Sequence, residues 1–177
     1  AVRIVTAHHA NDNAETVLFR LCRGTGLNGL CGIPACRRLG DGWVTRPLLP
    51  FTKEEILSYC RAEGLEFITD SSNLMPSCSR NILRMEALPA LERAVPGAAR
   101  TVARTAETLR RDADCLNGLA QAWETAHVRG RALHLDGFSA LHPALRSRVL
   151  ESFLGSLETV HLDALERQIL SGRGGCV

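Results

Sequence analysis

The sequence predicts an α/β fold in the first half of the chain and a mostly α-helical second half. Three observations lead to this prediction. The apolar run 2–5 is typical of a buried strand, and a helical pattern follows it at once. Residues 65–69 are expected to form another short strand. Beyond the Pro-Gly pair at 96–97, apolar residues recur every three or four positions, as in packed helices.

A polar cluster directly follows the first strand. Two histidines and two carboxylates lie between residues 6 and 16, namely His8, His9, Asp12 and Glu15. In open α/β sheets, ligands bind where strands end and helices begin. Asp12 and Glu15 are three positions apart, so on a helix both carboxylates lean toward the same space. The cluster is therefore a candidate for catalysis, and a simple N-terminal helix cap is the alternative interpretation.

Start and stop signals place two helices in the first half. The first begins at Asn11 or Asp12. Its core-facing positions are Val17, Leu18 and Leu21. The second is capped by Thr52 and stopped by Gly64. Its apolar positions have helical spacing and are Ile56, Leu57, Tyr59 and Cys60.

A glycine-rich segment covers residues 20–34. Glycines let backbone amides approach a ligand closely, and the neighbouring arginines suit phosphate. Such a segment by itself is most often a turn. Together with His8, Asp12 and Glu15, it predicts a site for a phosphate and a cation.

Three further arginines are candidates for phosphate binding. Arg46 is held in an extended segment by the proline that follows it. Arg80 and Arg84 accompany a helix predicted over 81–93, which Pro89 interrupts. For Arg80 and Arg84 a solvated helix face is the alternative interpretation.

The second half is predicted to begin after a boundary at 94–97. A long helix with a heptad stripe of apolar residues follows. The stripe comprises Val102, Ala106, Leu109, Ala113, Leu116, Ala120 and Trp123. A short strand or extended link is expected at 131–135. Two amphipathic helices complete the chain, one starting at His142 and one over 161–170.

Composition agrees with a chain that buries a core, since 45% of its 177 residues are hydrophobic. No apolar run approaches the roughly 20 residues of a membrane helix. Seven cysteines, an odd number without close pairing, indicate reduced thiols in a cytoplasmic protein. Cys31 and Cys36 lack a second ligand pair for zinc, so they are predicted to be core or loop thiols.

The net charge of +2 gives little support for nucleic-acid binding through charge alone. Arginines nevertheless gather around the start of the long helix. They are Arg93, Arg100, Arg104, Arg110 and Arg111. These side chains can meet phosphates, or they can form a solvated face with the neighbouring acids.

Four groups of residues occur in the order typical of one enzyme family. They are Ala7-His8-His9 with Asp12, Glu15 and Thr16; the glycine-rich 23–27 and 29–33; Arg46-Pro47-Leu48-Leu49; and Asp70-Ser71-Ser72-Asn73 with Ser79-Arg80-Asn81 and Arg84. By these motifs the chain resembles the bacterial tRNA(Ile)-lysidine synthases of the PP-loop, or N-type ATP pyrophosphatase, superfamily. The resemblance implies a partial Rossmann-like, adenine nucleotide alpha hydrolase-like parallel sheet in 1–94 and a helical tRNA-binding domain in 95–177.

The resemblance also implies a two-step ligation. ATP adenylates the C2 oxygen of the wobble cytidine in tRNA(Ile) with a CAU anticodon, and pyrophosphate leaves. The ε-amine of free L-lysine then attacks C2 and expels AMP, so that lysidine forms. ATP and Mg²⁺ are the expected cofactors and the cytoplasm is the expected location. No membrane is involved, and a homodimer is left open.

Site roles follow from the matching positions. Asp12 and Glu15 bind the lysine ammonium, and His8 orients them or accepts a proton from the amine. Arg80 binds triphosphate or stabilises charge on the leaving phosphates. These four residues are the expected catalytic residues, and none is assigned to a metal. The other expected ATP contacts are Gly24, Gly26 and Arg46, and the expected tRNA contacts are Arg84, Arg100 and Arg104.

The chain departs from the family pattern in three places. The family's ATP loop, Ser-Gly-Gly-x-Asp-Ser, would precede Ala1, so we expect a truncated piece that is inactive by itself. Residues 171–177 resemble the start of a further domain. Cys78 stands where the family often carries an aromatic residue.

Two other function classes remain open at this point. His8, His9 and Asp12 are spaced so that they can bind zinc or manganese in a metal-dependent hydrolase. A non-catalytic RNA-binding fragment is the second alternative. Metal analysis of the purified protein separates the hydrolase from the ligase.

Overall fold

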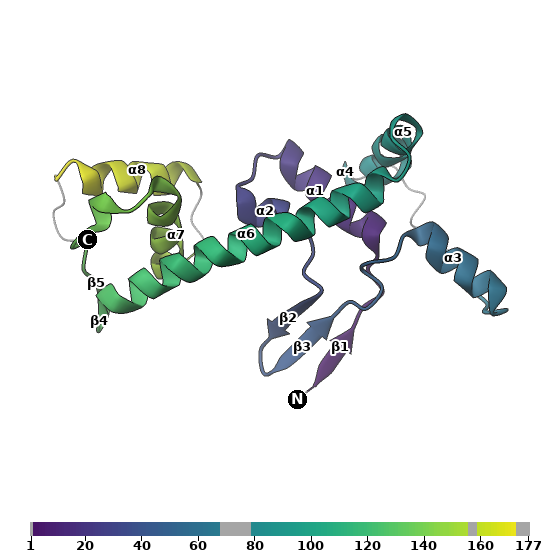
Figure 1. Cartoon of the computed structure of the whole chain (residues 1–177), viewed down its shortest axis with the longest axis horizontal. Coiled ribbons are helices and arrows are strands. Elements are labelled where there is room, and N and C mark those ends of the chain that lie inside the picture. Colours follow the sequence, from purple (N-terminus) through teal and green to yellow (C-terminus); the bar gives the residue numbers. More distant parts are fainter. Residues whose placement is uncertain (1, 68–78, 156–158, 173–177) are drawn as a thin grey trace. The chain divides into compact units, whose positions relative to one another are not determined.

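The computed structural model describes residues 2–67, 79–155 and 159–172 (Figure 1). The chain forms two compact units, Ala1–Arg111 and Asp112–Val177. The long helix α6 (Ala98–His127) begins in the first unit and ends in the second. It starts directly after a break in the helices at 95–97, within the segment where the sequence predicts a boundary. Each unit has a hydrophobic core of its own.

The first unit contains a three-stranded sheet in the order β1-β3-β2. β1 (Arg3–Val5) runs parallel to β3 (Gly42–Thr45), and β2 (Cys36–Leu39) pairs with β3 in antiparallel fashion. The parallel pair agrees with the predicted α/β class. The sequence analysis did not predict the β2–β3 hairpin, because β2 is half arginine and lacks the alternating apolar pattern of a strand.

β1 is a strand as predicted, but it is not buried. Val2, Ile4 and Val5 expose 75%, 48% and 66% of their surface. The prediction of a buried strand was wrong because β1 forms the edge of the sheet and, within the described residues, pairs only with β3. The Thr6 amide donates to the Thr45 carbonyl at 3.0 Å, so the two parallel strands end side by side.

Helix α1 (Ala10–Cys22) begins earlier than predicted, since its N-cap is His9 rather than Asn11 or Asp12. The Asp12 amide donates to His9 Nδ1 at 3.4 Å, and the His9 amide donates to Asp12 Oδ2 at 3.0 Å. This is a capping box in which an imidazole replaces the usual hydroxyl, because the Nδ1 of a neutral histidine accepts hydrogen bonds. The prediction missed it because histidine is an uncommon cap.

The core of the first unit is small. Ala14, Leu88 and Ala99 are buried in it, and Leu18 and Val102 pack against it. Val17 is also buried, as predicted. Leu21 was predicted to face the core but is 56% exposed, because the core ends one helical turn earlier, at Leu18.

Helix α3 (Lys53–Ala62) starts and stops where the sequence predicts. Thr52 Oγ1 accepts from the Glu55 amide at 3.3 Å, and Glu55 Oε2 accepts from the Thr52 amide at 2.9 Å. Gly64 follows the helix with a φ of +63°, which glycine adopts without strain.

The strand predicted at 65–69 does not form over residues 65–67, so this part of the prediction was wrong. Leu65 and Phe67 are 52% and 48% exposed, and residues 65–67 pair with no strand in the described part of the chain. Residues 68–69, the polar motif 70–73 and Cys78 lie outside the described residues, as do residues 173–177 of the terminal motif.

A continuous helical stretch runs over α4 (Ser79–Ile82), the π-helical turn η2 (Leu83–Ala87) and α5 (Leu88–Ala94). Pro89 was predicted to interrupt this helix but occupies one of the first two positions of α5, where its missing N–H is tolerated. The irregularity lies one turn earlier, in η2, where the Leu88 amide donates to the Leu83 carbonyl. A π-helical turn within a helix is often found at functional sites.

The second unit is mostly helical, as predicted. It contains the end of α6, the hairpin β4 (Val128–Arg129) and β5 (Ala132–Leu133), the 3₁₀ turn η3 (Phe138–Ala140), α7 (Pro143–Leu154) and α8 (Thr159–Leu170). The His142 side chain accepts from the Ala144 amide at 3.2 Å and so caps α7 at the predicted position. The short strand predicted at 131–135 is present as β5.

The core of the second unit confirms the heptad stripe of α6. Ala120 is buried together with Phe138 from η3, Val149 and Leu150 from α7, and Leu162 from α8. Every member of the predicted stripe is buried or half-buried, including Ala106 and Ala113 in the described part of α6. Apolar spacing alone was therefore sufficient to identify the packed face of this helix.

Candidate active site

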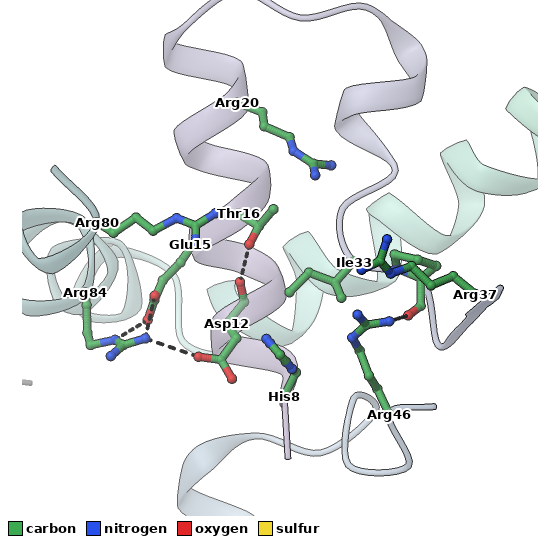
Figure 2. A pocket seen from close by; sticks show the side chains of 11 residues that line it. His8, Asp12, Glu15, Thr16, Arg20, Ile33, Arg37, Arg46, Arg80 and Arg84 are labelled. Atoms are coloured by element: carbon green, nitrogen blue, oxygen red, sulfur yellow. Dashed lines mark hydrogen bonds and ion pairs between the residues drawn. The ribbon is translucent and has the colours of Figure 1, made fainter. Parts of the chain in front are cut away.

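A pocket of about 450 Å³ lies in the first unit, where β1 and β3 end and α1 begins (Figure 2). This is the edge of an α/β sheet at which ligands bind. Among the described residues, five arginines and two carboxylates line it, which is a surplus of three positive charges when His8 is neutral. The lining residues are His8, Asp12, Glu15, Thr16, Arg20, Ile33, Pro34, Arg37, Arg46, Arg80 and Arg84.

The carboxylates of Asp12 and Glu15 both reach the pocket from the first turns of α1. Asp12 also belongs to the capping box, so the helix cap itself fixes its position. The two interpretations of this cluster, a catalytic site and a helix cap, are thus compatible. Glu15 is only 5% exposed, and a carboxylate buried to this extent needs a charged or hydrogen-bonding partner.

Arg84 is that partner. Its Nε donates to Glu15 Oε1 at 2.8 Å and its Nη2 to Glu15 Oε2 at 2.9 Å, a bidentate pair. The same Nη2 lies 3.2 Å from Asp12 Oδ1. Figure 2 shows the guanidinium between the two acids. The tRNA contact expected for Arg84 stays a prediction, and in this structure the side chain belongs to the pocket.

Arg80 lines the same pocket, from α4. Its guanidinium carbon lies 5.5 Å from the centre of the Phe19 ring, and that of Arg23 lies 5.2 Å from the same ring. Such cation–π contacts orient a guanidinium without neutralising it. Arg80 is therefore placed beside the acids of α1, and no carboxylate of the described residues forms an ion pair with it.

The glycine-rich segment is attached to α1 by side chains. Arg20 Nη1 donates to the carbonyls of Gly29 and Gly32, each at 3.1 Å. Asn13 Oδ1 accepts from the Ile33 amide at 2.7 Å. Arg20 thus stabilises the loop while lining the pocket.

The two glycines expected to contact ATP lie outside the set of lining residues. Gly24 has a φ of +75°, and Gly26 is the N-cap of α2 (Leu27–Leu30). A Cβ at either position would meet no atom within 4 Å. Both glycines are therefore accessible at the backbone but stand apart from the acids and arginines of the pocket.

Arg46 enters the pocket from the segment that follows β3. It is 8% exposed, and its Nη1 donates to the Pro34 carbonyl at 2.8 Å. Burial, with the nearby positive charge of Arg37 as a second cause, lowers the pKa of Arg46 below the usual value for arginine. Arg46 Nε is a buried polar atom, and it has no hydrogen-bond partner among the described residues.

The histidines are held by local contacts. His8 Nδ1 lies 2.9 Å from Thr6 Oγ1, and His9 is the cap of α1. In the described part of the chain, no group of three histidine, cysteine, aspartate or glutamate side chains is placed to hold a metal ion. The metal-dependent hydrolase built on His8, His9 and Asp12 therefore has no support from the geometry, and Cys31 and Cys36 are not part of a zinc site among these residues.

Arg100 and Arg104, the other two expected tRNA contacts, do not line the pocket. Arg100 forms an ion pair with Glu55 of α3, and Arg104 is exposed on α6. The Arg100 side chain contributes to lowering the pKa of Glu55, after the larger effect of the Thr52 amide.

The sequence analysis did not single out Arg37, Ile33 and Pro34 as pocket residues. Arg37 lies on β2, a strand that the sequence pattern did not reveal. Ile33 and Pro34 follow the glycines, and only the folded loop brings them to the ends of the strands. Ile33 and Pro34 belong to the glycine-rich segment 20–34 that was predicted to form part of the site, whereas no local signal marks Arg37.

Fold and site together define a class of protein. A parallel strand pair with an arginine-rich pocket at the strand ends is typical of an α/β domain that binds phosphorylated ligands. The PP-loop domain family matches residues 1–91. The chain therefore belongs to the PP-loop family, whose fold is adenine nucleotide alpha hydrolase-like.

Curated relatives match different shares of the chain. A protein of Symbiobacterium thermophilum is 53% identical over 91 residues, which are 51% of this chain and 19% of the relative. One of Pseudomonas aeruginosa is 49% identical over 88 residues, 50% of this chain and 20% of the relative. One of Salinispora arenicola is 38% identical over 183 residues, 98% of this chain and 55% of the relative.

All three relatives are named tRNA(Ile)-lysidine synthase. The chain spans between about a fifth and just over half of their lengths. These names agree with the family that the sequence motifs resemble. No helix among the described residues is both long enough and apolar enough to cross a membrane.

Proposed function

We propose that this chain carries part of the active site of a tRNA(Ile)-lysidine synthase. The names of the relatives support the type of reaction, and membership of the PP-loop family supports the use of ATP. One observation carries the proposal, namely that two acids from α1 share a pocket with arginines from four other segments of the first unit. Such a pocket suits an amine and a phosphate-bearing group together.

In the amine step, Asp12 and Glu15 bind the ε-ammonium of free L-lysine. Arg84 bonds to the same oxygens, so the ammonium replaces some of these hydrogen bonds when it enters. The amine must lose a proton before it attacks, and His8 accepts it through the ring nitrogen that does not face Thr6. The new bond joins the lysine nitrogen to C2 of the cytidine, and the bond from C2 to the adenylate oxygen breaks as AMP leaves.

In the adenylation step, Arg80 and Arg46 bind phosphate oxygens of ATP and stabilise the charge that develops on the departing pyrophosphate. Gly24 and Gly26 offer backbone amides to the nucleotide. Mg²⁺ is the expected companion of ATP, and the described residues contain no group of three histidine, cysteine, aspartate or glutamate side chains that could hold a metal ion by themselves. We therefore assign no step to the metal.

The RNA substrate is tRNA(Ile) with the CAU anticodon. Arg84, Arg100 and Arg104 are its proposed contacts in this chain, through phosphate oxygens. The cytoplasm is the proposed location, because tRNA and free lysine are both substrates. The possible homodimer is tested by sedimentation.

The amine step is tested in the complete product of the gene that encodes this chain, by transfer of labelled lysine to a tRNA(Ile) transcript. Asp12→Asn and Glu15→Gln are each expected to lower the rate by at least about 100-fold, since each removes a charge that binds the reacting amine. Binding of tRNA, measured by filter retention, is expected to change little.

Matched controls are Asp114→Asn and Glu54→Gln, which remove exposed carboxylates outside the pocket. Lysine transfer at the unchanged rate in both pocket variants would reject the assignment of the two acids.

The adenylation step is tested by release of pyrophosphate from ATP in the presence of the tRNA and the absence of lysine. Arg80→Ala is expected to slow this release by about 100-fold or more, because it removes a cation that stabilises the leaving group. Arg61→Ala, at an exposed position of α3 outside the pocket, is the control. Normal pyrophosphate release by the Arg80 variant would remove Arg80 from the site.

A further inference from the structure

The pocket has a second basic end, formed by Arg37 and Arg46. Figure 2 shows these two side chains on one side of the pocket. Arg84 lies on the other side, together with Asp12 and Glu15. Arg37 belongs to β2, and Arg46 directly follows β3, the strand paired with β2. The hairpin therefore brings two guanidinium groups to one place, although they are far from the acids in sequence.

Arg46 is buried without a full set of acceptors. Its Nη1 donates to the Pro34 carbonyl at 2.8 Å, but its buried Nε has no partner among the described residues. A buried N–H without an acceptor costs free energy, so an uncompensated one at a pocket wall favours the arrival of an acceptor. The burial of Arg46 makes this an internal donor rather than a surface charge.

No carboxylate within the described residues forms an ion pair with Arg37 or Arg46. At the other end of the pocket, Glu15 and Asp12 compensate Arg84. Among the described residues, the positive charge without an ion-pair partner is therefore carried by Arg37 and Arg46 at this end of the pocket, by Arg80, and by Arg20, which donates to backbone carbonyls only. Burial lowers the pKa of Arg46, and the proximity of Arg37 lowers it further, as expected for neighbouring like charges.

We propose that Arg37 and Arg46 form a binding site for an oxyanion of a small-molecule ligand, distinct from the ammonium site at Asp12 and Glu15. Guanidinium groups bind carboxylate and phosphate oxygens through paired N–H donors, and both chemistries fit this pair. That the oxyanion belongs to a reactant rests on the proposed function. Its source is then a nucleotide phosphate, as proposed above for Arg46, and the carboxylate of lysine is the alternative that the test distinguishes.

The test measures binding without turnover, by calorimetric titration of the complete gene product with pyrophosphate, L-lysine and L-lysinamide in separate arms. Arg37→Gln removes one charge of the pair at an exposed position and keeps a polar side chain. Arg38→Gln is the matched control, because Arg38 is the next residue of the same strand, is also exposed and does not line the pocket. Arg46→Lys is a second variant, with its fold checked by circular dichroism.

Arg37→Gln is expected to weaken one ligand by about 10-fold, whereas Arg38→Gln changes its affinity less than about 2-fold. Selective weakening of pyrophosphate assigns the site to a phosphate. Selective weakening of L-lysine, with lysinamide unaffected, assigns it to the carboxylate. The proposal would be overturned if Arg37→Gln and Arg38→Gln had equal effects on the binding of all three ligands, or if the protein bound neither pyrophosphate nor L-lysine. A failure of lysine transfer to tRNA leaves these binding arms readable, so the two proposals fail separately.

Discussion

Asn13 shows how a single side chain connects helix α1 to the pocket wall. Its Oδ1 accepts from the Ile33 amide at 2.7 Å, and it is 5% exposed. Gly32, the residue before Ile33, has a φ of +64°. A Cβ there would lie 2.1 Å from Asn13 Oδ1. Both the backbone conformation and the available space therefore require glycine at this position.

Gly32→Ala is expected to destabilise the protein by about 2 kcal/mol or more, from backbone strain together with displacement of Asn13. Gly24→Ala is the control, because Gly24 also has positive φ but a Cβ there meets no atom within 4 Å. Urea unfolding of both variants measures the difference. Equal destabilisation would show that the contact with Asn13 contributes nothing.

At the scale of elements, Glu92 of α5 acts as the cap of the next helix. Its Oε2 accepts from the Gly97 amide and its Oε1 from the Ala99 amide, both at 2.8 Å. The Ala99 hydrogen bond is the largest cause that lowers the pKa of Glu92 below its usual value of about 4.5. The carboxylate therefore compensates the free amides at the start of α6.

Glu92→Gln is expected to reduce stability at neutral pH by about 1 kcal/mol, the usual contribution of a helix cap. Because the pKa is lowered in the folded state, the contribution of Glu92 is present above pH 4.5 and is lost as the pH falls through the folded-state pKa. The stability difference between wild type and variant should thus disappear in acid.

The measurement for Glu92 is urea unfolding at several pH values, with Glu63→Gln as a control at an exposed position. A difference between Glu92→Gln and wild type that persists undiminished at low pH would contradict the ionic role of this cap.

Sequence signals such as helix caps and apolar spacing predicted the helices that depend on residues close together in the chain. Thr52 with Glu55, His142 with Pro143, and the apolar stripe of α6 all act within a few residues, and these helices were predicted correctly. The β2–β3 hairpin and the exposure of β1 depend on strand pairing across the sheet. The pair of Arg84 with Glu15 joins residues 69 positions apart. The sequence predicts that Asp12, Glu15 and Arg80 belong to one site. Only the folded chain shows that Arg84 is the cation that pairs with the two acids.

At the scale of the whole molecule, the two units have separate cores that share no residue. Each unit also contains one of the two tryptophans, Trp43 in β3 and Trp123 in α6. Trp123 packs edge-on against Phe138, with ring centres 5.9 Å apart. Fluorescence of single-tryptophan variants can therefore follow the two units individually.

Phe138→Ala is expected to destabilise the second unit by about 3–5 kcal/mol, because Phe138 is fully buried in its core. In the Trp43→Phe background, Trp123 should report unfolding at much lower urea. In the Trp123→Phe background, Trp43 should report a midpoint that moves much less. Equal shifts of both midpoints would show that the units unfold as one cooperative body.

The unequal numbers of guanidinium and carboxylate groups around the pocket have a consequence for the order in which reactants arrive. A free cation approaching the pocket meets net electrostatic repulsion, because five guanidinium groups face two carboxylates among the described residues. A polyvalent anion is attracted to the pocket. Once bound, it neutralises the surplus positive charge and leaves Asp12 and Glu15 available to a second, cationic ligand. On the proposed function, the electric field of the pocket favours a sequence in which the nucleotide binds first and the amine follows.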